Sequence, residues 1–447
     1  MGGNVKISVI GTGYLGAVHS VAMAHLGFDV VGVDVDRRKI QSLRDGVAPF
    51  YEPGFNSLLA QANSSGRLTW TRDYAELGDA DLHFICVGTP QQSGAHAADL
   101  SHLWSAIKEL RPNLKPQSVI AGKSTVPVGT AQGIQRSISD GWPGGESDVP
   151  IVVWNPEFLR EGFAVEDTLH PDRIVIGLPA GTRGRTASAV MRQVYVSMIE
   201  ADVPFIETDV VTAELVKVAA NAFLATKISF INAMAEVCEA TGGDVLALAD
   251  AIGHDDRIGR RFLGAGVGFG GGCLPKDIRA FSARAGELGV DQALTFLNEV
   301  DAINSRRRDR AASAARDLAG GDLRGRRVAV LGAAFKPNSD DVRDSPALDI
   351  AQRIHNQGAE VVVHDPKAIA NGQAIFPNLA FMDSARDVLT GADVVLLLTE
   401  WSEYVDLDPA EVRQFVREPN ILDGRNALDP VRWKAAGWRY RGMGREH

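Results

Sequence analysis

The stretch Val5-Lys6-Ile7-Ser8-Val9-Ile10-Gly11-Thr12-Gly13-Tyr14-Leu15-Gly16 decides the fold of the first part of the chain. It joins an apolar run to the motif G-x-G-x-x-G, and a helical run over residues 14–26 follows it. Strand, glycine turn and helix in this order predict a βαβ unit that binds a dinucleotide. The glycines allow a tight turn and close approach of a pyrophosphate, whose charge the helix N-terminus stabilises. The predicted cradle consists of Gly11, Thr12, Gly13, Tyr14, Leu15 and Gly16.

The next apolar run, residues 30–34, ends in an acid, Asp34. A carboxylate at this place binds the ribose hydroxyls of the adenosine and repels a 2′-phosphate. The sequence therefore predicts NAD rather than NADP as the cofactor.

Composition narrows the class of protein. The chain has 447 residues, is 45% hydrophobic and 23% charged, and has a net charge of -10, which argues against a nucleic-acid partner. We expect no membrane partner, because no stretch approaches the length of a membrane span and no secretory signal is evident at the N-terminus. The three cysteines are too few and too widely spaced for a disulfide framework, and no Cys/His cluster has zinc-ligand spacing, so we expect no metal and a cytoplasmic location.

Apolar runs and helical patterns alternate at both ends of the chain, which predicts an α/β protein with two Rossmann-like parallel-sheet domains. A stretch without Pro or Gly, residues 211–241, predicts one long central helix that Gly242-Gly243 ends, and Asp244 could cap the next helix. A further helix is expected over residues 294–318. Expected strands are 5–10, 30–34, 82–87, 118–122 and 151–154 in the first half, and 328–332, 361–365, 394–399 and 420–423 in the second.

The predicted domains are 1–208 (NAD-binding), 209–320 (central, helical) and 321–447 (C-terminal, Rossmann-like). Ala80-Asp81-Leu82 and Ala392-Asp393-Val394 each precede an apolar run, a faint internal repeat. The second half lacks the glycine motif: Gly332-Ala333-Ala334-Phe335-Lys336 has one glycine and a lysine. It could bind another phosphate-bearing ligand or be purely structural.

Cys273 follows the glycine-rich run 266–272, and Pro275 suits the first turn of a helix. A cysteine just before a helix N-terminus is favoured as the thiolate, its nucleophilic form. A redox cradle together with such a cysteine suggests oxidation through a covalent thioester. Cys86 and Cys238 are expected to be buried packing residues.

Three residue pairs lie one helical turn apart. Lys217 and Asn221 could stabilise an oxyanion, or could be a snorkelling lysine and a satisfied core amide. Glu157 and Glu161 follow Pro156 and could share one face of a helix near a ligand, or could simply favour a helix N-terminus. In the third pair, Cys273 and Asp277, the acid could position or deprotonate a water, or sit in a first helical turn.

These strings, in this order, resemble the UDP-glucose/GDP-mannose dehydrogenase family. The matching strings are Gly11–Gly16 as quoted, Val87-Gly88-Thr89-Pro90, Lys123-Ser124-Thr125-Val126-Pro127-Val128-Gly129-Thr130, residues 155–161 with 171–177, residues 217–221, residues 269–277, and Asp423-Gly424-Arg425-Asn426. The string Asn-Pro-Glu-Phe-Leu-Arg-Glu-Gly is most like that of members that oxidise UDP-glucose.

The resemblance implies oxidation of the C6 alcohol of UDP-glucose to the acid of UDP-glucuronate with two NAD. It implies that Cys273 forms a thiohemiacetal and then a thioester. It further implies that Asp277, Thr125 and Glu157 orient the hydrolytic water, and that Lys217 and Asn221 stabilise the oxyanions. Lys217 and a water bound to Asp277 are both candidates for the first base.

The resemblance also implies ligand contacts. Those to NAD are Gly11 to Gly16, Asp34, Lys39, Thr89, Ser124, Thr125, Glu161, Lys276 and Arg343. Those to the nucleotide sugar are Glu157, Phe158, Leu159, Arg160, Glu161, Lys217, Asn221, Arg257, Phe262, Leu263, Gly264, Ala265, Gly266, Gly270, Lys336 and Arg425. Arg257 is expected to reach the substrate of a neighbouring subunit, which implies a homodimer or a multiple of dimers.

Some alternatives stay open at this point. The stretch 262–266 has glycine where some members carry lysine, so the sequence leaves the nucleotide of the substrate open. UDP is the first expectation, with TDP or GDP as alternatives. A two-electron dehydrogenase of the β-hydroxyacid type has a similar cradle but needs no cysteine. A non-catalytic nucleotide-sugar-binding protein is the third reading, and the intact set of Cys273, Lys217 and Asp277 argues against it.

Overall fold

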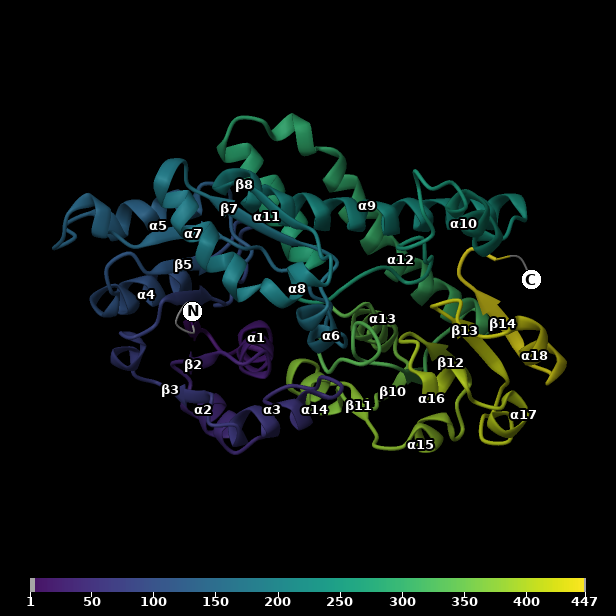
Figure 1. Ribbon diagram of the computed structural model, residues 1–447. Coiled ribbons are helices and arrows are strands. Elements are labelled where there is room, and N and C mark those ends of the chain that lie inside the picture. The colour runs from purple at the N-terminus through teal and green to yellow at the C-terminus, as the bar shows by residue number, and fades with distance from the viewer. Residues whose placement is uncertain (1–4, 446–447) are drawn as a thin grey trace. The chain divides into compact units, whose positions relative to one another are not determined.

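The computed structural model describes residues 5–445, which form two compact units (Figure 1). The first unit ends at Ala220 and the second begins at Asn221, within one long helix. The predicted fold class, two parallel-sheet α/β domains with a long central helix, is confirmed. The division into three domains stays a prediction.

The first unit is built on an eight-stranded sheet in the order β3-β2-β1-β4-β5-β6-β7-β8. Neighbouring strands are parallel except at β6 and β7, which pair antiparallel. The strands are β1 Lys6–Ile10, β2 Asp29–Val33, β3 Leu68–Thr71, β4 Leu82–Ile85, β5 Val119–Gly122, β6 Ile151–Trp154, β7 Ile174–Leu178 and β8 Phe205–Asp209.

Alternate side chains of these strands enter two separate hydrophobic cores, one on each face of the sheet. Phe84 lies in one core and Ile85 in the other, and Val153 and Trp154 divide in the same way. Both faces of a parallel sheet are covered by its crossover helices, so its strands are apolar throughout. This is why the central strands are visible in the sequence as continuous apolar runs.

Helices α1, α2, α3, α6, α7 and α8 contribute to one core, and α4 and α5 to the other. The helices of this unit are α1 Tyr14–His25, α2 Arg37–Arg44, α3 Phe55–Ser64, α4 Ser101–Leu110, α5 Thr130–Ser139, α6 Ala164–Leu169, α7 Gly181–Val194 and α8 Val196–Glu200, with short 3-10 turns η1 Tyr74–Leu77, η2 Arg111–Asn113 and η3 Glu146–Asp148.

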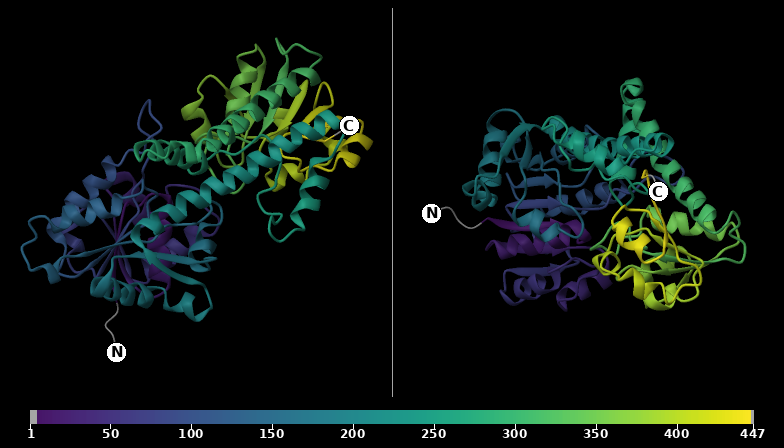
Figure 2. Two further views of the ribbon diagram at one scale, coloured as in Figure 1. Left: turned by 90° about the horizontal axis from the view of Figure 1, so that it is seen from above. Right: turned by 90° about the vertical axis from the view of Figure 1, so that its right-hand side faces the viewer.

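Helix α9, Val210–Thr241, confirms the long central helix predicted from the absence of Pro and Gly. Figure 2 shows it as one unbroken helix. By length and composition alone, α9 could cross a membrane, so the expectation that no stretch approaches that length is wrong. Core helices pass the same test, and the helix carries buried polar groups with partners: the Glu214 carboxylate accepts hydrogen bonds from the amides of Gly129 and Ala131, both at 2.7 Å.

In the second unit, α9 packs with α11 and α12 around Phe269, and its C-terminal part packs with α10. Asp244 caps α10 as predicted. The helices are α10 Val245–Gly253, α11 Leu274–Glu287, α12 Phe296–Leu318, α13 Pro346–His355, α14 Ile369–Ile375, α15 Ala385–Leu389, α16 Ser402–Val405, α17 Pro409–Val412 and α18 Pro430–Ala435, with the 3-10 turn η4 Asp291–Leu294.

The second sheet has six parallel strands in the order β11-β10-β9-β12-β13-β14, which repeats the arrangement of the first six positions of the first sheet. The strands are β9 Arg327–Leu331, β10 Glu360–His364, β11 Ala380–Phe381, β12 Val394–Leu397, β13 Asn420–Asp423 and β14 Arg439–Gly442. The faint repeat in the sequence has a structural counterpart. Asp81 accepts a hydrogen bond from the amide of Lys6 at the start of β1, and Asp393 does the same for Arg327 at the start of β9.

Candidate active site

The predicted cradle lies between β1 and α1. Gly11 has a positive φ of +88°, and a Cβ on Gly16 would lie 1.8 Å from the carbonyl oxygen of Gly11, so neither position accepts a side chain. A Cβ on Gly13 would meet nothing within 4 Å. No side chain caps α1, so its first amides face the open side of the turn without a capping partner. The turn therefore fits a pyrophosphate at the helix N-terminus.

Asp34 lies at the carboxyl end of β2 and shapes this turn. Its carboxylate accepts hydrogen bonds from the amide of Thr12 at 2.8 Å and from the amide of Asp36 at 2.9 Å. The acid predicted to bind ribose thus stands beside the glycine turn. Lys39 lies nearby in sequence on α2, and Leu15 packs against the hydrophobic core.

Tyr14 links the cradle to the loop after β6. Its hydroxyl donates to the buried carboxylate of Glu52 and accepts from the amide of Gly162 at 2.9 Å. Glu52 also accepts from the amides of Gly162 and Ala164, both at 2.7 Å. Burial and the neighbouring carboxylate raise the pKa of Tyr14 well above its ordinary value, so the phenol stays protonated. No motif in the sequence pointed to Glu52.

Thr89, Ser124 and Thr125 lie just after β4 and β5, at the carboxyl edge of the sheet where ligands of α/β folds bind. The Thr89 hydroxyl donates to the carbonyl of Thr125 at 2.7 Å, and the Ser124 hydroxyl donates to the carbonyl of Val87 at 2.7 Å. Both hydroxyl protons are thus used to tie the two loops together. A ligand at these two residues would meet their oxygen lone pairs or the backbone.

The expected helix over Glu157 and Glu161 is wrong. Residues 155–160 have no regular structure, and the next helix, α6, begins at Ala164. The Glu157 carboxylate accepts hydrogen bonds from the amides of Phe158 at 2.8 Å and Leu159 at 3.0 Å. A side chain that binds its own backbone in this way competes with helix formation, and Gly162 then turns the chain with a φ of 80°.

A buried lysine holds the other oxygen of Glu157. The Lys123 ammonium lies 2.9 Å from Oε2 of Glu157 and donates to Oδ1 of Asn155 at 3.0 Å. Asn155 is held in turn by the hydroxyl of Tyr195 at 2.6 Å and by the carbonyl of Val175 at 3.0 Å. Burial raises the pKa of Glu157, but the Lys123 ammonium outweighs it, so that the pKa lies below the ordinary value.

The ring of Phe158, next to Glu157 in the chain, contacts two positively charged side chains, Arg173 and Lys217. The ring lies 3.9 Å from the guanidinium carbon of Arg173 and 5.6 Å from the Lys217 ammonium. Lys217, on the first turns of α9, is half-buried. The first unit therefore gathers the cradle, the Glu157 carboxylate and the Lys217 ammonium.

Three further predicted residues lie in the loop after Glu157. Leu159 packs against the hydrophobic core. One edge of the Arg160 guanidinium binds both carboxylate oxygens of Asp167, with Nε donating at 2.9 Å and Nη2 at 2.7 Å. Glu161 is half-buried next to Gly162.

In the second unit, Cys273 is the N-cap of α11 and is exposed, with Pro275 in the first turn, as the sequence predicts. Cys86 and Cys238 are buried, also as predicted. Four residues beyond Cys273, Asp277 is only 2% exposed. Its Oδ2 accepts a hydrogen bond from the amide of Asn221 at 2.7 Å, and its Oδ1 lies 2.6 Å from the Lys276 ammonium. The structure thus joins Asn221 of α9 to Asp277 of α11, and gives Lys276 an acidic partner.

Two of the glycines before Cys273, Gly270 and Gly271, are required by their neighbours. A Cβ on Gly270 would lie 2.3 Å from the carbonyl oxygen of Asp344, and one on Gly271 would lie 2.8 Å from the ring of Phe335. A Cβ on Gly272 would lie 2.3 Å from the guanidinium carbon of Arg343, a residue that also pairs with Asp341. The run is therefore closely packed against the segment 335–346, and Arg343 lies beside the cysteine loop.

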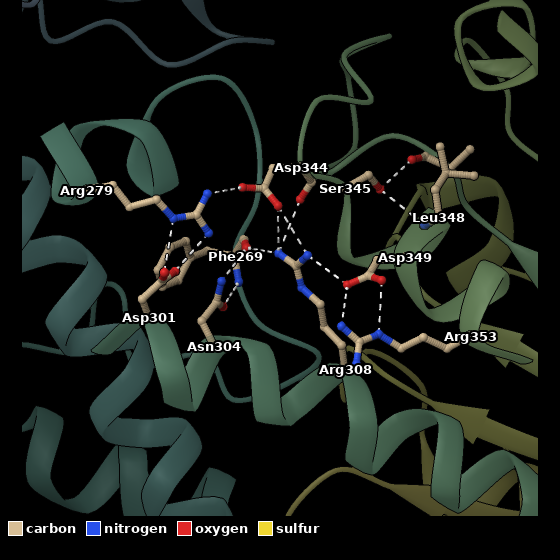
Figure 3. A network of polar contacts seen from close by, with 11 residues as sticks. Phe269, Arg279, Asp301, Asn304, Arg308, Asp344, Ser345, Leu348, Asp349 and Arg353 are labelled. Carbon is tan, nitrogen blue, oxygen red and sulfur yellow. Dashed lines mark hydrogen bonds and ion pairs between the residues drawn. The ribbon is translucent and has the colours of Figure 1, made fainter. Parts of the chain in front are cut away.

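Asp344 has the unfavourable φ of 49°, and a network of charges holds it there (Figure 3). The Arg308 guanidinium binds its carboxylate at 3.2 Å and Asp349 at 2.9 Å. Arg279 of α11 binds Asp344 from the other side at 3.3 Å. Asn304 holds the backbone of Phe269 through two hydrogen bonds of 2.8 and 3.0 Å. Helix α12 thereby fixes both the cysteine loop and the segment on which the loop packs.

The loop predicted to bind the nucleotide sugar, residues 262–266, begins with an unfavourable backbone angle at Phe262 and is held by hydrogen bonds at Gly266. Phe262 has a φ of 67° and is 39% exposed, whereas Leu263 and Ala265 are buried. A Cβ on Gly264 would meet nothing within 4 Å. The amide of Gly266 donates to the buried side chain of Asn232 at 2.9 Å, and its carbonyl accepts from buried Arg307 at 3.0 Å.

Three predicted substrate residues of this unit carry positive charge. The Arg425 guanidinium binds the carbonyls of Leu398, Gly268 and Phe335 at 2.8, 3.0 and 3.1 Å, so much of it supports the fold. The Lys336 ammonium lies 5.3 Å from the ring centre of Phe335. Arg257 is exposed and pairs with Asp255 two residues earlier.

The sequence indicated no role for the residues that hold the named ones in place, although Lys123 and Asn155 lie within the matching strings. In the first unit these are Glu52, Lys123, Asn155 and Tyr195, and in the second Asn232, Arg307, Arg308 and Asp344. A lysine directly after a buried strand, in Gly122-Lys123, is the one available signal.

Comparisons with known proteins agree along the whole chain. Residues 5–199, 211–306 and 329–430 match the NAD binding, central and UDP binding domains of the UDP-glucose/GDP-mannose dehydrogenase family. The chain is 42% identical over 445 residues to the UDP-glucose 6-dehydrogenase of Rhizobium meliloti (strain 1021), covering 99% of this chain and 100% of that protein. It is 40% identical to the UDP-glucose 6-dehydrogenase of Rickettsia conorii (strain ATCC VR-613 / Malish 7), covering 98% and 99%.

A solved UDP-glucose dehydrogenase from Pyrobaculum islandicum superposes with a TM-score of 0.88 at 37% identity, covering 99% of this chain and 98% of that one. Full-length identity, the three matched domains, the glycine turn with Asp34 and the cysteine at the N-terminus of α11 agree with one another. The chain belongs to the UDP-glucose/GDP-mannose dehydrogenase family, and its cofactor is NAD.

Proposed function

We propose that this chain oxidises UDP-glucose at C6 to UDP-glucuronate, a four-electron oxidation that uses two NAD. The observation that carries the proposal is Cys273 at the N-terminus of α11, one turn from the buried pair Asn221–Asp277. An alcohol dehydrogenase that stops at the aldehyde needs no nucleophile there. The full-length relatives named for UDP-glucose support the substrate.

NAD, when bound, accepts the hydride in each oxidation. Its pyrophosphate would lie on the Gly11–Gly16 turn and its ribose on Asp34, with Lys39, Thr89, Ser124, Thr125, Glu161, Lys276 and Arg343 as further proposed contacts. The residues present fit this group, because Gly13 leaves room on the turn and no side chain caps α1.

The chemistry of the chain itself centres on Cys273. The aldehyde carbon formed by the first oxidation is attacked by the thiolate, which a helix N-terminus favours. The thiohemiacetal alkoxide needs hydrogen-bond donors, which Lys217 and Asn221 supply. In the second oxidation this carbon loses its hydride, the alkoxide oxygen becomes a carbonyl oxygen and a thioester results. In the last step, water attacks the thioester carbon, the carbon–sulfur bond breaks and the thiolate leaves.

Three groups are proposed to orient that water: Asp277, Thr125 and Glu157. The Asn221 amide and the Lys276 ammonium hold the Asp277 carboxylate on both oxygens. Two candidates remain for the base of the first oxidation, Lys217 and a water bound to Asp277.

The nucleotide sugar is proposed to lie against the residues that the family resemblance names. These are Glu157, Phe158, Leu159, Arg160, Glu161, Lys217, Asn221, Arg257, Phe262, Leu263, Gly264, Ala265, Gly266, Gly270, Lys336 and Arg425.

A panel of nucleotide sugars tests the substrate. With NAD present, we expect UDP-glucose to give the highest kcat/KM, measured by nicotinamide absorbance, and TDP-glucose and GDP-mannose to give less. A higher kcat/KM with either of the latter two would overturn the choice of UDP. We also expect Cys273→Ser to form no net acid while it still binds NAD. Undiminished uronate from that variant would overturn the thioester route.

We further propose a homodimer, or a multiple of dimers, formed through α9. Phe223, Phe230 and Val237 of this helix are 66%, 49% and 51% exposed. They lie seven residues apart and therefore form one stripe of an α-helix. Large exposed apolar stripes mark association sites, and Phe230→Asp is expected to halve the mass measured by light scattering. An unchanged mass would contradict this interface. The cytoplasmic location stays a prediction.

A further inference from the structure

We propose that Lys123 is a positioning residue for thioester hydrolysis: its buried ammonium fixes Glu157 as an ionised acceptor of the hydrolytic water. The inference rests on the function proposed above and adds a residue to it. It is drawn from contacts within the first unit alone.

The position of Lys123 follows from the sheet. It directly continues β5, and its amide donates to the carbonyl of Ile85 of β4 at 2.9 Å. Asn155 directly continues the neighbouring strand β6, and its amide donates to the carbonyl of Gly122 at 2.8 Å. Adjacent parallel strands end at the same edge, so the two side chains meet there.

Lys123 is only 4% exposed. A buried ammonium is costly unless it is paired and hydrogen-bonded. Its partners are the Glu157 carboxylate, Oδ1 of Asn155 and, at 5.6 Å from the ring centre, Phe84. Asn155 cannot turn away, because its Oδ1 also accepts from the hydroxyl of Tyr195 and its Nδ2 donates to the carbonyl of Val175. The ammonium is therefore held in one place.

Counting acceptor positions shows what this does to Glu157. A carboxylate oxygen accepts about two hydrogen bonds. The two amides of Phe158 and Leu159 fill Oε1, and Lys123 fills one position on Oε2. One position on Oε2 is left, and the side chain is 18% exposed. A carboxylate held in this way presents one lone pair in a fixed direction, as a water-orienting group requires.

Charge decides whether that position accepts or donates. Because the two amides occupy Oε1 and Lys123 occupies one position on Oε2, a proton on Glu157 would take the remaining position, which then donates instead of accepting. That position therefore accepts a hydrogen bond from water while Glu157 is ionised, and burial works against ionisation. The ammonium of Lys123 reverses this, and Lys217 acts in the same direction. The other titratable groups that face this pair are Tyr195, Cys86 and His19; burial raises the pKa of Tyr195 and Cys86 and lowers that of His19, so all three are neutral near pH 7.

The test compares Lys123→Met with a matched control, Lys115→Met. Lys115 also pairs with a carboxylate of the first unit, Asp81, but this pair is exposed. In Lys123→Met, we expect the acid limb of the kcat profile to move up by about one to three pH units. We also expect NADH to appear in a burst of two per active site before a slow steady state. In Lys115→Met, neither readout should change.

A double-variant cycle separates positioning from folding. If Lys123 acts through Glu157, adding Lys123→Met to Glu157→Gln slows hydrolysis by less than twofold beyond Glu157→Gln alone, whereas independent defects multiply. The double variant removes both charges of the buried pair, so neither is left without a partner. Lys123→Arg keeps the positive charge opposite Glu157. If Lys123→Met does not fold, these two variants carry the test, and Lys123→Arg should retain the wild-type acid limb.

A wild-type pH profile in Lys123→Met, or multiplicative defects in the double variant, would overturn the inference. A shifted acid limb in Lys123→Arg would do the same. These outcomes differ from failure of the proposed function, which would appear as no turnover of any nucleotide sugar by the unmodified protein.

Discussion

Gly270→Ala is expected to destabilise the second unit by disturbing the cysteine loop. The added Cβ would lie 2.3 Å from the carbonyl oxygen of Asp344 and 2.7 Å from Cδ of Pro346. Neither atom belongs to a flexible side-chain end, and Arg308 and Arg279 hold Asp344 in place. The backbone of the loop or of the segment beneath it must therefore move.

The size of the effect follows from this geometry. Inserting a methyl group into a closely packed site costs about 1–3 kcal/mol. For a unit of this size, each 1 kcal/mol lowers the midpoint of thermal unfolding by about 2–4 °C. The variant is therefore expected to unfold about 2–12 °C below the unmodified protein, measured by calorimetry.

Gly286→Ala is the matched control, because it makes the same change in α11, the helix that begins directly after Cys273. A Cβ on Gly286 would meet nothing within 4 Å. Alanine is favoured over glycine in a helix by about 0.5–1 kcal/mol. The midpoint of thermal unfolding of this variant should therefore lie slightly above that of the unmodified protein.

Alkylation by iodoacetamide reports the local effect on the loop. Cys86 and Cys238 are buried, and Cys273 is the exposed thiol. We expect its alkylation rate to change in Gly270→Ala and to stay constant in Gly286→Ala. Equal stability of Gly270→Ala and the unmodified protein, or an equal loss in Gly286→Ala, would refute the packing argument.

Other predictions concern single buried or charged groups. Asp34→Ala should weaken NAD binding by about tenfold or more, since it removes charge-assisted hydrogen bonds and also releases the amide of Thr12; unchanged affinity in a fluorescence titration would remove Asp34 from the cofactor site. Glu52→Leu should destabilise the first unit by about 1–3 kcal/mol, because the amides of Gly162 and Ala164 lose their acceptor; urea unfolding measures this, and an unchanged midpoint would contradict it. Burial lowers the pKa of His83 to about 3, so the unfolded chain binds the proton first as pH falls below about 6.5, and stability is lost from there down to about pH 3. His83→Gln should lose less stability than the unmodified protein between pH 6 and pH 4, and equal losses would contradict the assignment.

Much of the fold is predictable because parallel strands with both faces covered are apolar throughout. β6 and β13 have the predicted bounds, and other central strands differ by a few residues at their ends. β3, β7 and β14 were also not among the expected strands, although β7 is buried and apolar. β8 was not predicted because it is mostly exposed and lies at the edge of its sheet, and β11 has only two residues. Short or solvated strands leave no apolar run to detect.

Site residues are predictable where a short stretch of sequence contains the whole pattern. Pro275 after Cys273 gives the helix start, and Gly11 to Gly16 with Asp34 gives the cradle. Local spacing failed for Glu157, because its own side chain binds the two amides that a helix would need.

Partners from separate elements leave no pattern in the sequence. Lys123 meets Glu157 because neighbouring strands end side by side, and Arg308 meets Asp344 across two elements. Spacing along the chain does not encode such contacts, so the residues that hold the reactive groups were the ones missed.

The most direct test of the account is the amount of NADH formed per UDP-glucose consumed, with the acid product measured in parallel. A thioester on Cys273 that is oxidised and then hydrolysed predicts two NADH and one UDP-glucuronate for each substrate. A ratio of one, with the aldehyde as product, would contradict the role given to Cys273.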